Sequence, residues 1–449
     1  MTYRSIGIAT ACALVASHAI LPANAQTSSD AQAILAELRT MKQAYESRIT
    51  ALENKIIRME AAKSTGATKP NSTPGGSTRT IRDNSFNPSI GIILNGKATS
   101  FSEDSSNIAG FAIGEEGERG KEGLSIDESE LNFSANIDDK FYGSLTTAIV
   151  REGTEDKIEL EEAYVMTLPD AGLPAGSRIK AGRAFWTLGY LNEHHSHADD
   201  FADRPLPYRA YLNKAYNDDG IEVSYVLPTD FYSEIGGGIF RGDDFPFGGS
   251  TGGLDTFSAF ARIGGDIGDN QNWRLGAYTL RGNATSRATG EGAVTFNGDT
   301  NLYAADLRYT WAPTGNPREQ ELILQAEFFH RDEEGRYTDT GAGTGTVAYN
   351  EASSGWYAQS VYKFAPSWRV GARYSQLLAA NVPTGLAGSA LDNGGHDPYS
   401  VSVMGDWTNS EYGRLRLQYN YEELTKNQED HQVVLQYIMS FGAHGAHAF

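Results

Sequence analysis

The sequence predicts an all-β protein: a transmembrane antiparallel β-barrel of about 16 strands, preceded by an N-terminal α-helical coiled coil. Three observations lead to this fold class: an unusual composition, a two-residue hydrophobic period from Pro88 to the end, and connections that alternate between short and long. Of 449 residues, 49 are Gly and 23 are Tyr, yet the mean hydropathy is only −0.42. A helical membrane protein needs apolar runs of about 18 residues, and the sequence contains none.

Charge and cysteine content limit the partners and the compartment. The formal net charge is −20, from 57 acidic and 37 basic residues. Such a surface repels phosphate backbones, so nucleic acid is excluded as a partner. The one cysteine, Cys12, lies in a segment that we expect to be removed, which leaves an exported chain without disulfides.

Residues 1–25 have the pattern of a secretory signal peptide. Arg4 supplies the positive charge, an apolar stretch follows, and Ala23-Asn24-Ala25 fits a cleavage site. A lipoprotein signal through Cys12 is the alternative, but Ala9 stands three residues before it in place of Leu.

Residues 30–62 predict a periplasmic coiled coil, and residues 63–87, rich in Ser, Thr, Gly and Pro, predict a flexible linker. An amphipathic helix packed on its own chain is the alternative to the coiled coil. The heptad positions are Leu35, Leu38, Lys42, Tyr45, Ile49, Leu52, Ile56 and Met59.

Residues 88–449 predict an outer-membrane β-barrel, because an even number of alternating strands with short and long connections is typical of that architecture. Longer connections fall near 102–123, 187–218, 242–254, 283–299, 333–353 and 378–396. The sixteen predicted strands lie near 89–101, 124–137, 140–152, 157–168, 177–186, 219–227, 231–241, 255–265, 272–282, 300–312, 320–332, 354–365, 367–377, 397–408, 412–423 and 429–441.

The two faces of the strands favour a membrane barrel over a soluble β-sandwich. Aromatic residues such as Tyr303 and Trp311 stand eight apart on one face, which spans about 20 Å along the membrane normal at the usual strand rise and tilt. The other face carries charges that a dry core could not hold, but a water-filled lumen could hydrate. The residues predicted to line the pore are Glu159, Glu161, Arg178, Lys180, Glu222, Arg262, Arg308, Arg369, Arg373, Arg414 and Arg416.

The order of these parts resembles the phosphate-selective porin (porin O and P) family. Similar stretches are Leu160–Val165, Ile179–Arg183 and Arg204-Pro205, and the chain ends in Phe449. The resemblance implies a trimer of 16-stranded barrels in the outer membrane of a Gram-negative bacterium, a third loop folded into the barrel and a preference for anions. A terminal aromatic residue on a final amphipathic strand also resembles the signal that outer-membrane barrels present to their insertion machinery, so Phe449 is predicted to serve that purpose.

The connection at about Thr187–Asp218 is the third at the end of the barrel that carries the long loops, after 102–123 and the short one at 152–157. It is therefore the predicted constriction loop, but it carries more acidic than basic residues. A phosphate channel needs many cationic donors, so a weakly selective channel or one for another solute fits better. The residues of interest in this loop are His194, His195, His197, Asp199, Asp200, Asp203, Arg204 and Arg209.

Three alternatives stay open for the histidines. His194, His195 and His197 are candidate ligands for Zn²⁺ or a similar cation, although their spacing matches no established zinc motif. They also fit a role in narrowing the pore, or in packing against the barrel wall.

The wall charges separate along the chain: glutamates lie on early strands and Arg369, Arg373, Arg414 and Arg416 on late ones. They predict either a transverse field across the lumen or simple pairing with neighbours, such as Arg369 and Arg373 with Asp406.

Two function classes remain. The first is a porin for passive diffusion of small hydrophilic solutes or ions, and the second is a structural tether that reaches the cell wall through its coiled coil. Residues 26–87 are too few for the plug of an energised receptor. No nucleophile motif or phosphate loop is present, so neither an enzyme nor a cofactor is predicted; His330 on the outer wall has no evident catalytic partner.

Overall fold

The computed structural model describes residues 88–152, 155–248 and 253–442. The predicted signal peptide, coiled coil and linker lie outside the described residues, as does Phe449. The strands are β1 Ser89–Phe101, β2 Gly123–Ile126, β3 Ser129–Asn136, β4 Phe141–Glu152, β5 Glu155–Thr167, β6 Ser177–Phe185, β7 Asn217–Val226, β8 Tyr232–Phe240, β9 Thr256–Asp266, β10 Gln271–Thr289, β11 Val294–Trp311, β12 Glu321–Asp339, β13 Val347–Ala365, β14 Trp368–Leu378, β15 Tyr399–Ser410, β16 Gly413–Thr425 and β17 Gln428–Gly442.

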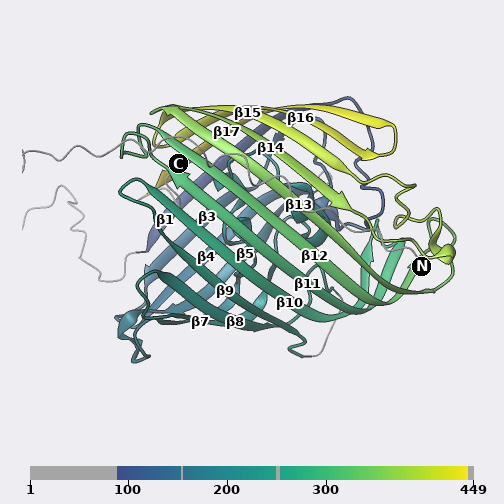
Figure 1. Ribbon diagram of the computed structural model, residues 1–449, viewed down its shortest axis with the longest axis horizontal. Helices are drawn as coiled ribbons and strands as arrows, with labels where there is room; N and C mark the ends of the chain where they lie inside the picture. Colours follow the sequence, from purple (N-terminus) through teal and green to yellow (C-terminus); the bar gives the residue numbers. More distant parts are fainter. Residues whose placement is uncertain (1–87, 153–154, 249–252, 443–449) are drawn as a thin grey trace, which may run out of the picture. The chain divides into compact units, whose positions relative to one another are not determined.

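These strands form a closed antiparallel barrel (Figure 1). Consecutive strands pair from β3 to β17, β1 pairs with β3, and the ring closes where Gly91–Phe101 of β1 pairs with Gln432–Gly442 of β17. The short β2 pairs with β1 ahead of β3, as an extra strand. The predicted class, a barrel of 16 strands, is confirmed for the described residues. Closure satisfies the backbone groups that an open sheet would leave at its edges.

Two predictions about strand limits are wrong. The predicted strand 124–137 is interrupted at Asp127-Glu128, where the register against β1 shifts by one residue. The predicted long loops 283–299 and 333–353 are mostly strand, because β10 to β13 extend as two tall hairpins with tips at 290–293 and 340–346. Their alternation continues into polar residues such as Arg287 and Glu333, which pair with each other inside the barrel.

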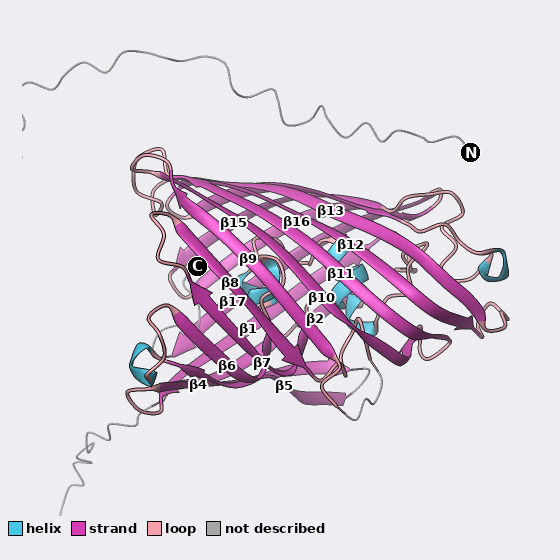
Figure 2. Cartoon of the chain, turned by 60° about the horizontal axis from the view of Figure 1, so that its bottom comes forward, coloured by secondary structure: helices cyan, strands magenta, loops and turns pink. Residues whose placement is uncertain are grey.

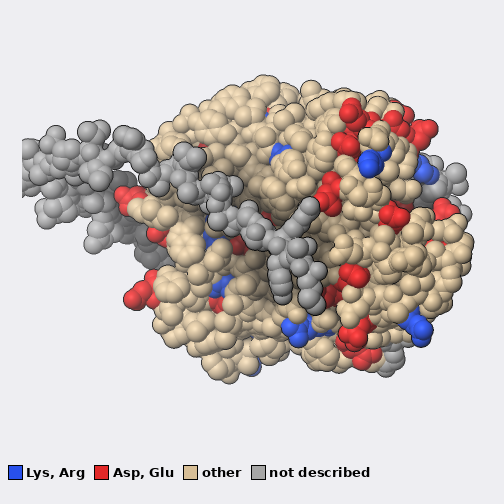
Figure 3. Space-filling view, turned by 45° about the vertical axis from the view of Figure 1, so that its right-hand side comes forward, with Lys and Arg blue, Asp and Glu red and all other residues tan. Residues whose placement is uncertain are grey.

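Burial along the strands is the reverse of that in a soluble protein. In β16 and β17, the apolar side chains of Leu417 and Leu435 are 57% and 44% exposed, whereas Gln432 and Gln436 are 4% and 1% exposed. The same alternation runs along the other strands, and Figure 3 shows broad uncharged stretches of surface with the charged side chains gathered in groups. An apolar outer band around a polar interior is the pattern of a barrel in lipid.

Helices contribute little to the described part of the chain. The α-helix there, α2 (Leu206–Leu212), has seven residues, and short 3₁₀ turns complete the helical content. In the described residues, no helix combines the length and the hydropathy needed to cross a membrane.

The outer face makes a stability prediction. Leu417→Arg puts a cation on the apolar face in the middle of β16, and we expect it to lower the free energy of unfolding from lipid vesicles by about 2–4 kcal/mol. Equilibrium unfolding in guanidinium measures this. Thr425→Arg, at the end of the same strand, is the control and is expected to cost about 0–1 kcal/mol. Equal costs for the two variants would contradict the assignment of the outer band.

Candidate functional site

The connection between β6 and β7, residues 186–216, lies inside the barrel, and we call it the inner loop. It contains the 3₁₀ turns η3 (Leu191–Glu193) and η4 (Ser196–Ala198) and the helix α2, every residue of which is buried. Helix α2 packs against β12, β13 and β14, and Figure 2 shows helical segments in the middle of the ring of strands in addition to those at its ends. This is the segment that the sequence predicts as the constriction loop.

Local sequence explains where α2 begins and ends. Pro205 stands at the N-cap and Pro207 in the first turn, where a fixed φ favours the helix and a missing N–H costs nothing. Asn213 ends the helix at a φ of 50°, in the left-handed region that Asn tolerates.

The first part of the inner loop is anchored on Glu327 of β12. Its carboxylate accepts hydrogen bonds from the backbone N–H of Tyr190 at 2.9 Å and of Leu191 at 3.2 Å, and from the hydroxyls of Tyr208 at 2.9 Å and Tyr357 at 2.5 Å. Four donors converge on one carboxylate, so the first part of the inner loop and helix α2 are attached to the wall at the same residue.

The middle of the inner loop binds four wall arginines on β14 and β16, which we call the arginine row: Arg369, Arg373, Arg414 and Arg416. Asp200 lies 2.8 Å from Arg369, and Asp203 lies 2.8 Å from Arg373. The guanidinium groups of β16 donate to backbone carbonyls instead, Arg414 to His197 at 2.5 Å and Arg416 to Asp199 at 2.8 Å.

The three aspartates differ in how the arginine row affects them. Burial opposes ionisation of Asp200 and Asp203, but the guanidinium groups of Arg369 and Arg373 outweigh it and hold both pKa values below the ordinary range. Asp199 is also buried and pairs with Arg204 at 2.6 Å, but burial prevails and raises its pKa to about 7.

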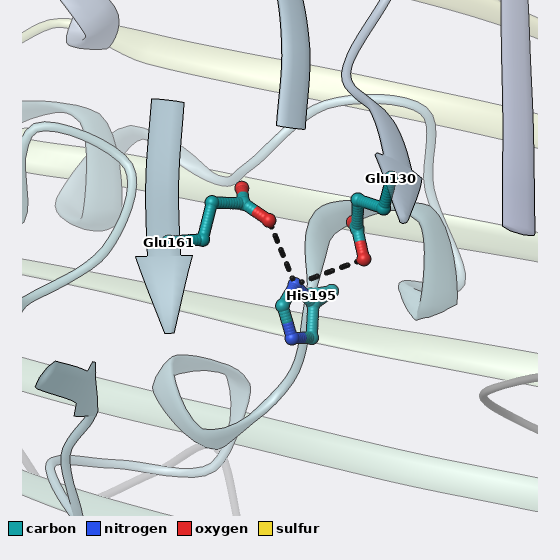
Figure 4. A group of neighbouring side chains, drawn as sticks. All are labelled: Glu130, Glu161 and His195. Atoms are coloured by element: carbon teal, nitrogen blue, oxygen red, sulfur yellow. Dashed lines mark ion pairs between the residues drawn. The ribbon is translucent and has the colours of Figure 1, made fainter. Parts of the chain in front are cut away.

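Near β3 and β5, the histidines of the inner loop contact a group of wall carboxylates, which we call the glutamate cluster: Glu128, Glu130, Glu161 and Glu162. His195 Nε2 lies 3.0 Å from Glu162, and its Nδ1 faces Glu130 and Glu161 (Figure 4). His197 Nδ1 lies 2.7 Å from Glu130. Burial disfavours the imidazolium of His195, but these carboxylates outweigh burial and hold its pKa well above the ordinary value.

Two irregularities in the wall assemble the glutamate cluster. The register between β4 and β5 shifts at Glu161, so that Glu161 and Glu162 both reach inward although they are adjacent in sequence. The interruption at Asp127-Glu128 likewise brings Glu128 to Ser196 of the loop, while Glu130 follows on β3. Between β3 and β5, the small residues Thr146 and Ala148 of β4 leave room for the longer side chains to meet.

A third side of the wall also holds the inner loop. Glu193 pairs with Arg262 of β9 at 2.6 Å, and Arg262 pairs with Glu234 at 2.8 Å. Glu222 of β7 accepts from the Thr187 hydroxyl at 2.9 Å. The loop therefore contacts the wall on the sides of β9, of β3 to β5, and of β14 to β16.

The other residues that the sequence predicts to line the pore lie in different surroundings. Arg178 pairs with Glu234, Lys180 donates to the carbonyl of Phe185, and Arg308 donates to Gln325 and lies over the ring of Tyr190. Glu159 is exposed.

Within the loop, His194 stacks on Tyr190 and is not part of the glutamate cluster. Arg204 donates to the carbonyls of Leu191 and His194, and Arg209 pairs with Glu422 at 3.1 Å. On the outer wall, His330 contacts Asp332 and Ser354.

The structure corrects two expectations about the wall charges. Arg369 does pair with Asp406, at 2.6 Å, but Arg373 pairs with Asp203, because its neighbour across the strands is Ser402. Several residues predicted to line the pore are also covered: Arg373, Arg414 and Arg416 are only 1–4% exposed, because the inner loop lies over them.

Sequence patterns alone miss several contacts of the inner loop. Glu128, Glu130 and Glu162 escape notice because the register shifts break the two-residue period that identifies inward positions. The first long connection, 102–122, also enters the barrel: Phe111 packs edge-on against Tyr211, and Arg209 donates to the carbonyl of Gly117. Buried apolar residues at Ile108 and Ile113 are its only sequence signal.

Comparison with known proteins shows the fold but not a family. No family model matches the chain, so the resemblance to porins O and P is not confirmed. A relative from Aquifex aeolicus (strain VF5), described as an uncharacterized protein, is 26% identical over 348 residues, which is 73% of this chain and 71% of that protein.

Two solved structures share the architecture. The outer membrane channel DcaP of Acinetobacter baumannii is 13% identical, with a TM-score of 0.50, over 79% of this chain and 97% of that one. An anion-selective porin from Comamonas acidovorans is 9% identical, with a TM-score of 0.51, over 79% and 99%. The chain thus has the fold of outer-membrane porins.

The raised pKa of Asp199 predicts how stability depends on pH. Between about pH 4 and 7, the folded protein keeps a proton on Asp199 that the unfolded chain loses, so this residue makes the free energy of unfolding fall as pH rises. Asp199→Asn should remove that fall, which thermal unfolding across this pH range measures.

The control for this prediction is Asp203→Asn. The pKa of Asp203 is lower in the folded protein than in the unfolded chain. Its contribution to the free energy of unfolding is therefore complete above the unfolded-state pKa, and it is lost only as the pH falls through the folded-state pKa. Asp203→Asn should therefore lower stability at pH 7 without changing the slope between pH 4 and 7. A slope unchanged in Asp199→Asn would contradict the prediction.

Proposed function

We propose that this protein is an outer-membrane porin, a channel for passive diffusion of small hydrophilic solutes or ions. The observation that carries the proposal is the reversed burial of a closed 16-stranded wall, apolar outside and charged inside. A wall of this kind holds a polar path through a lipid bilayer. The inner loop then acts as the constriction that sets the size of the path.

The pairing inside the barrel supports weak ion selectivity. An anion channel needs cationic donors that face the passing ion. Here Asp200 and Asp203 of the loop and Asp406 of the wall offset three of the four charges of the arginine row. Backbone carbonyls of the loop also occupy N–H donors of Arg414 and Arg416.

We further propose the outer membrane of a Gram-negative bacterium as the location, with the coiled coil of residues 30–62 in the periplasm and a trimer as the assembly. Fold supports the location, because closed barrels with this outer band occur in that membrane. The heptad pattern supports an oligomer, because its apolar seam needs a partner helix.

Recording from the purified full-length protein in planar lipid bilayers tests the channel. We expect stable conductance steps, grouped in threes if the trimer is correct, and swelling of liposomes in small sugars. A folded protein that inserts but stays silent and admits no sugar would contradict the channel and favour the structural tether.

The loop carboxylates give a prediction about selectivity. Replacing Asp200 and Asp203 together with Asn removes two negative charges and uncovers Arg369 and Arg373, so the reversal potential in a tenfold KCl gradient should shift toward chloride. The control, Asp139→Asn with Asp170→Asn, removes two exposed charges from short connections and should leave the potential unchanged. Identical potentials in both double variants would show that the inner loop does not line the path.

A further inference from the structure

Three ligand-type side chains from three separate elements converge within the glutamate cluster. His195 Nδ1 of the inner loop lies 3.3 Å from Glu130 Oε2 of β3 and 3.4 Å from Glu161 Oε2 of β5, as Figure 4 shows. All three ligand atoms lie within 4.8 Å of one another, and the three side chains are at most 9% exposed.

The other ring nitrogen of His195 is held by the barrel wall. Nε2 lies 3.0 Å from Glu162 Oε2, where a carboxylate accepts the Nε2–H. Nδ1 then points toward two carboxylates, to which it presents either a proton, as in the imidazolium, or a lone pair that can bind a cation. The arrangement therefore needs a positive charge at its centre, supplied either by the Nδ1 proton or by a metal ion in its place.

A second observation points to a ligand at the same place. Glu161 Oε2 is buried and makes no hydrogen bond within the described residues, although an unsatisfied buried carboxylate oxygen is costly. The oxygen is aimed at His195 Nδ1 and toward the centre of the three side chains (Figure 4).

The spacing matches a tetrahedral metal centre. With Zn–N and Zn–O bonds of about 2.0–2.2 Å, two ligand atoms on a tetrahedron are about 3.3–3.6 Å apart. The two measured separations, 3.3 and 3.4 Å, agree with that edge. The third separation, between the two carboxylate oxygens, is at most 4.8 Å.

We propose that Glu130, Glu161 and His195 bind a divalent cation of the zinc type. An imidazole nitrogen among the ligands favours Zn²⁺ over Ca²⁺ and Mg²⁺, which prefer oxygen. Glu162 orients His195 through Nε2, and His197 orients Glu130 through a 2.7 Å contact, which is the outer-shell arrangement common around zinc histidines. This inference does not depend on the channel function.

The bound cation joins the inner loop to two wall strands. His195 belongs to the loop, whereas Glu130 and Glu161 belong to β3 and β5, so the metal acts as a cross-link between them. Occupancy would then stabilise the folded barrel and hold this part of the loop against the wall.

Zinc titration of the purified full-length protein in detergent, after EDTA treatment, tests the proposal. Isothermal titration calorimetry should give one Zn²⁺ per chain, and 1 mM Ca²⁺ should not displace it. Glu161→Gln and His195→Asn should each weaken zinc binding at least about tenfold, and Glu162→Gln should weaken it about 10–100-fold. Heat-modified mobility in gel electrophoresis confirms that each variant is folded, and Glu130→Gln replaces any ligand variant that is not.

Matched controls lie near two of the three ligands. His194→Asn lies one residue away in the loop but stacks on Tyr190, and Glu159→Gln lies on the same strand as Glu161 but is exposed. Both should bind zinc within about twofold of the wild type.

X-ray absorption of the zinc-loaded wild type should show one imidazole in a nitrogen and oxygen shell. Failure to bind zinc, equal displacement by Ca²⁺, or unchanged affinity in Glu161→Gln would overturn the site and show that a proton alone joins the three groups.

Discussion

Attraction between opposite charges across the barrel interior is the interaction on which the rest of the structure depends. The inner loop carries imidazoles at 195 and 197 and carboxylates at 200 and 203, and the wall presents the complementary charge to each. Because each buried charge has a partner, ionised groups can stay inside at low exposure. Removing one partner leaves the other buried and unpaired, so the loop and the wall depend on each other.

The division between an apolar outer face and a charged interior also explains the amino-acid composition. The outer face supplies little polarity, so charge has to sit in the connections or in the lumen, as the contrast between Leu435 and its neighbour Gln436 illustrates. Tyrosines serve on both faces: Tyr437 is on the outer wall, whereas Tyr208 and Tyr357 donate to Glu327 inside. Closure of the ring by β1 and β17, rather than a disulfide, completes the described barrel.

The sequence predicts the barrel well because a strand's two-residue period is a local property. The period along residues 415–421 can be read without knowing what lies beside the strand. The sequence also identifies the histidines and aspartates of the inner loop, since they cluster in one short segment. Their partners are not predictable in this way. Arg373 finds Asp203, not Asp406, because the loop's path across the lumen is a tertiary property.

Local irregularities in the strands account for most of the other features that the sequence does not predict. A register shift at Glu161 changes which side chains face inward, and no composition signal marks it. The tall hairpins of β10 to β13 carry polar residues toward their tips, so their upper halves resemble loops in sequence. Glu130 cannot be identified from the sequence for the same reason, although it contacts both His195 and His197.

A double-mutant cycle between Asp203→Asn and Arg373→Gln tests most directly whether charge pairing holds the inner loop in the lumen. Unfolding free energies of the wild type, the two single variants and the double variant give the coupling between one loop carboxylate and one wall guanidinium. If charge pairing holds the loop, the coupling should be favourable, by about 1–3 kcal/mol at pH 7. A coupling indistinguishable from zero would mean that the loop does not rest on the arginine row.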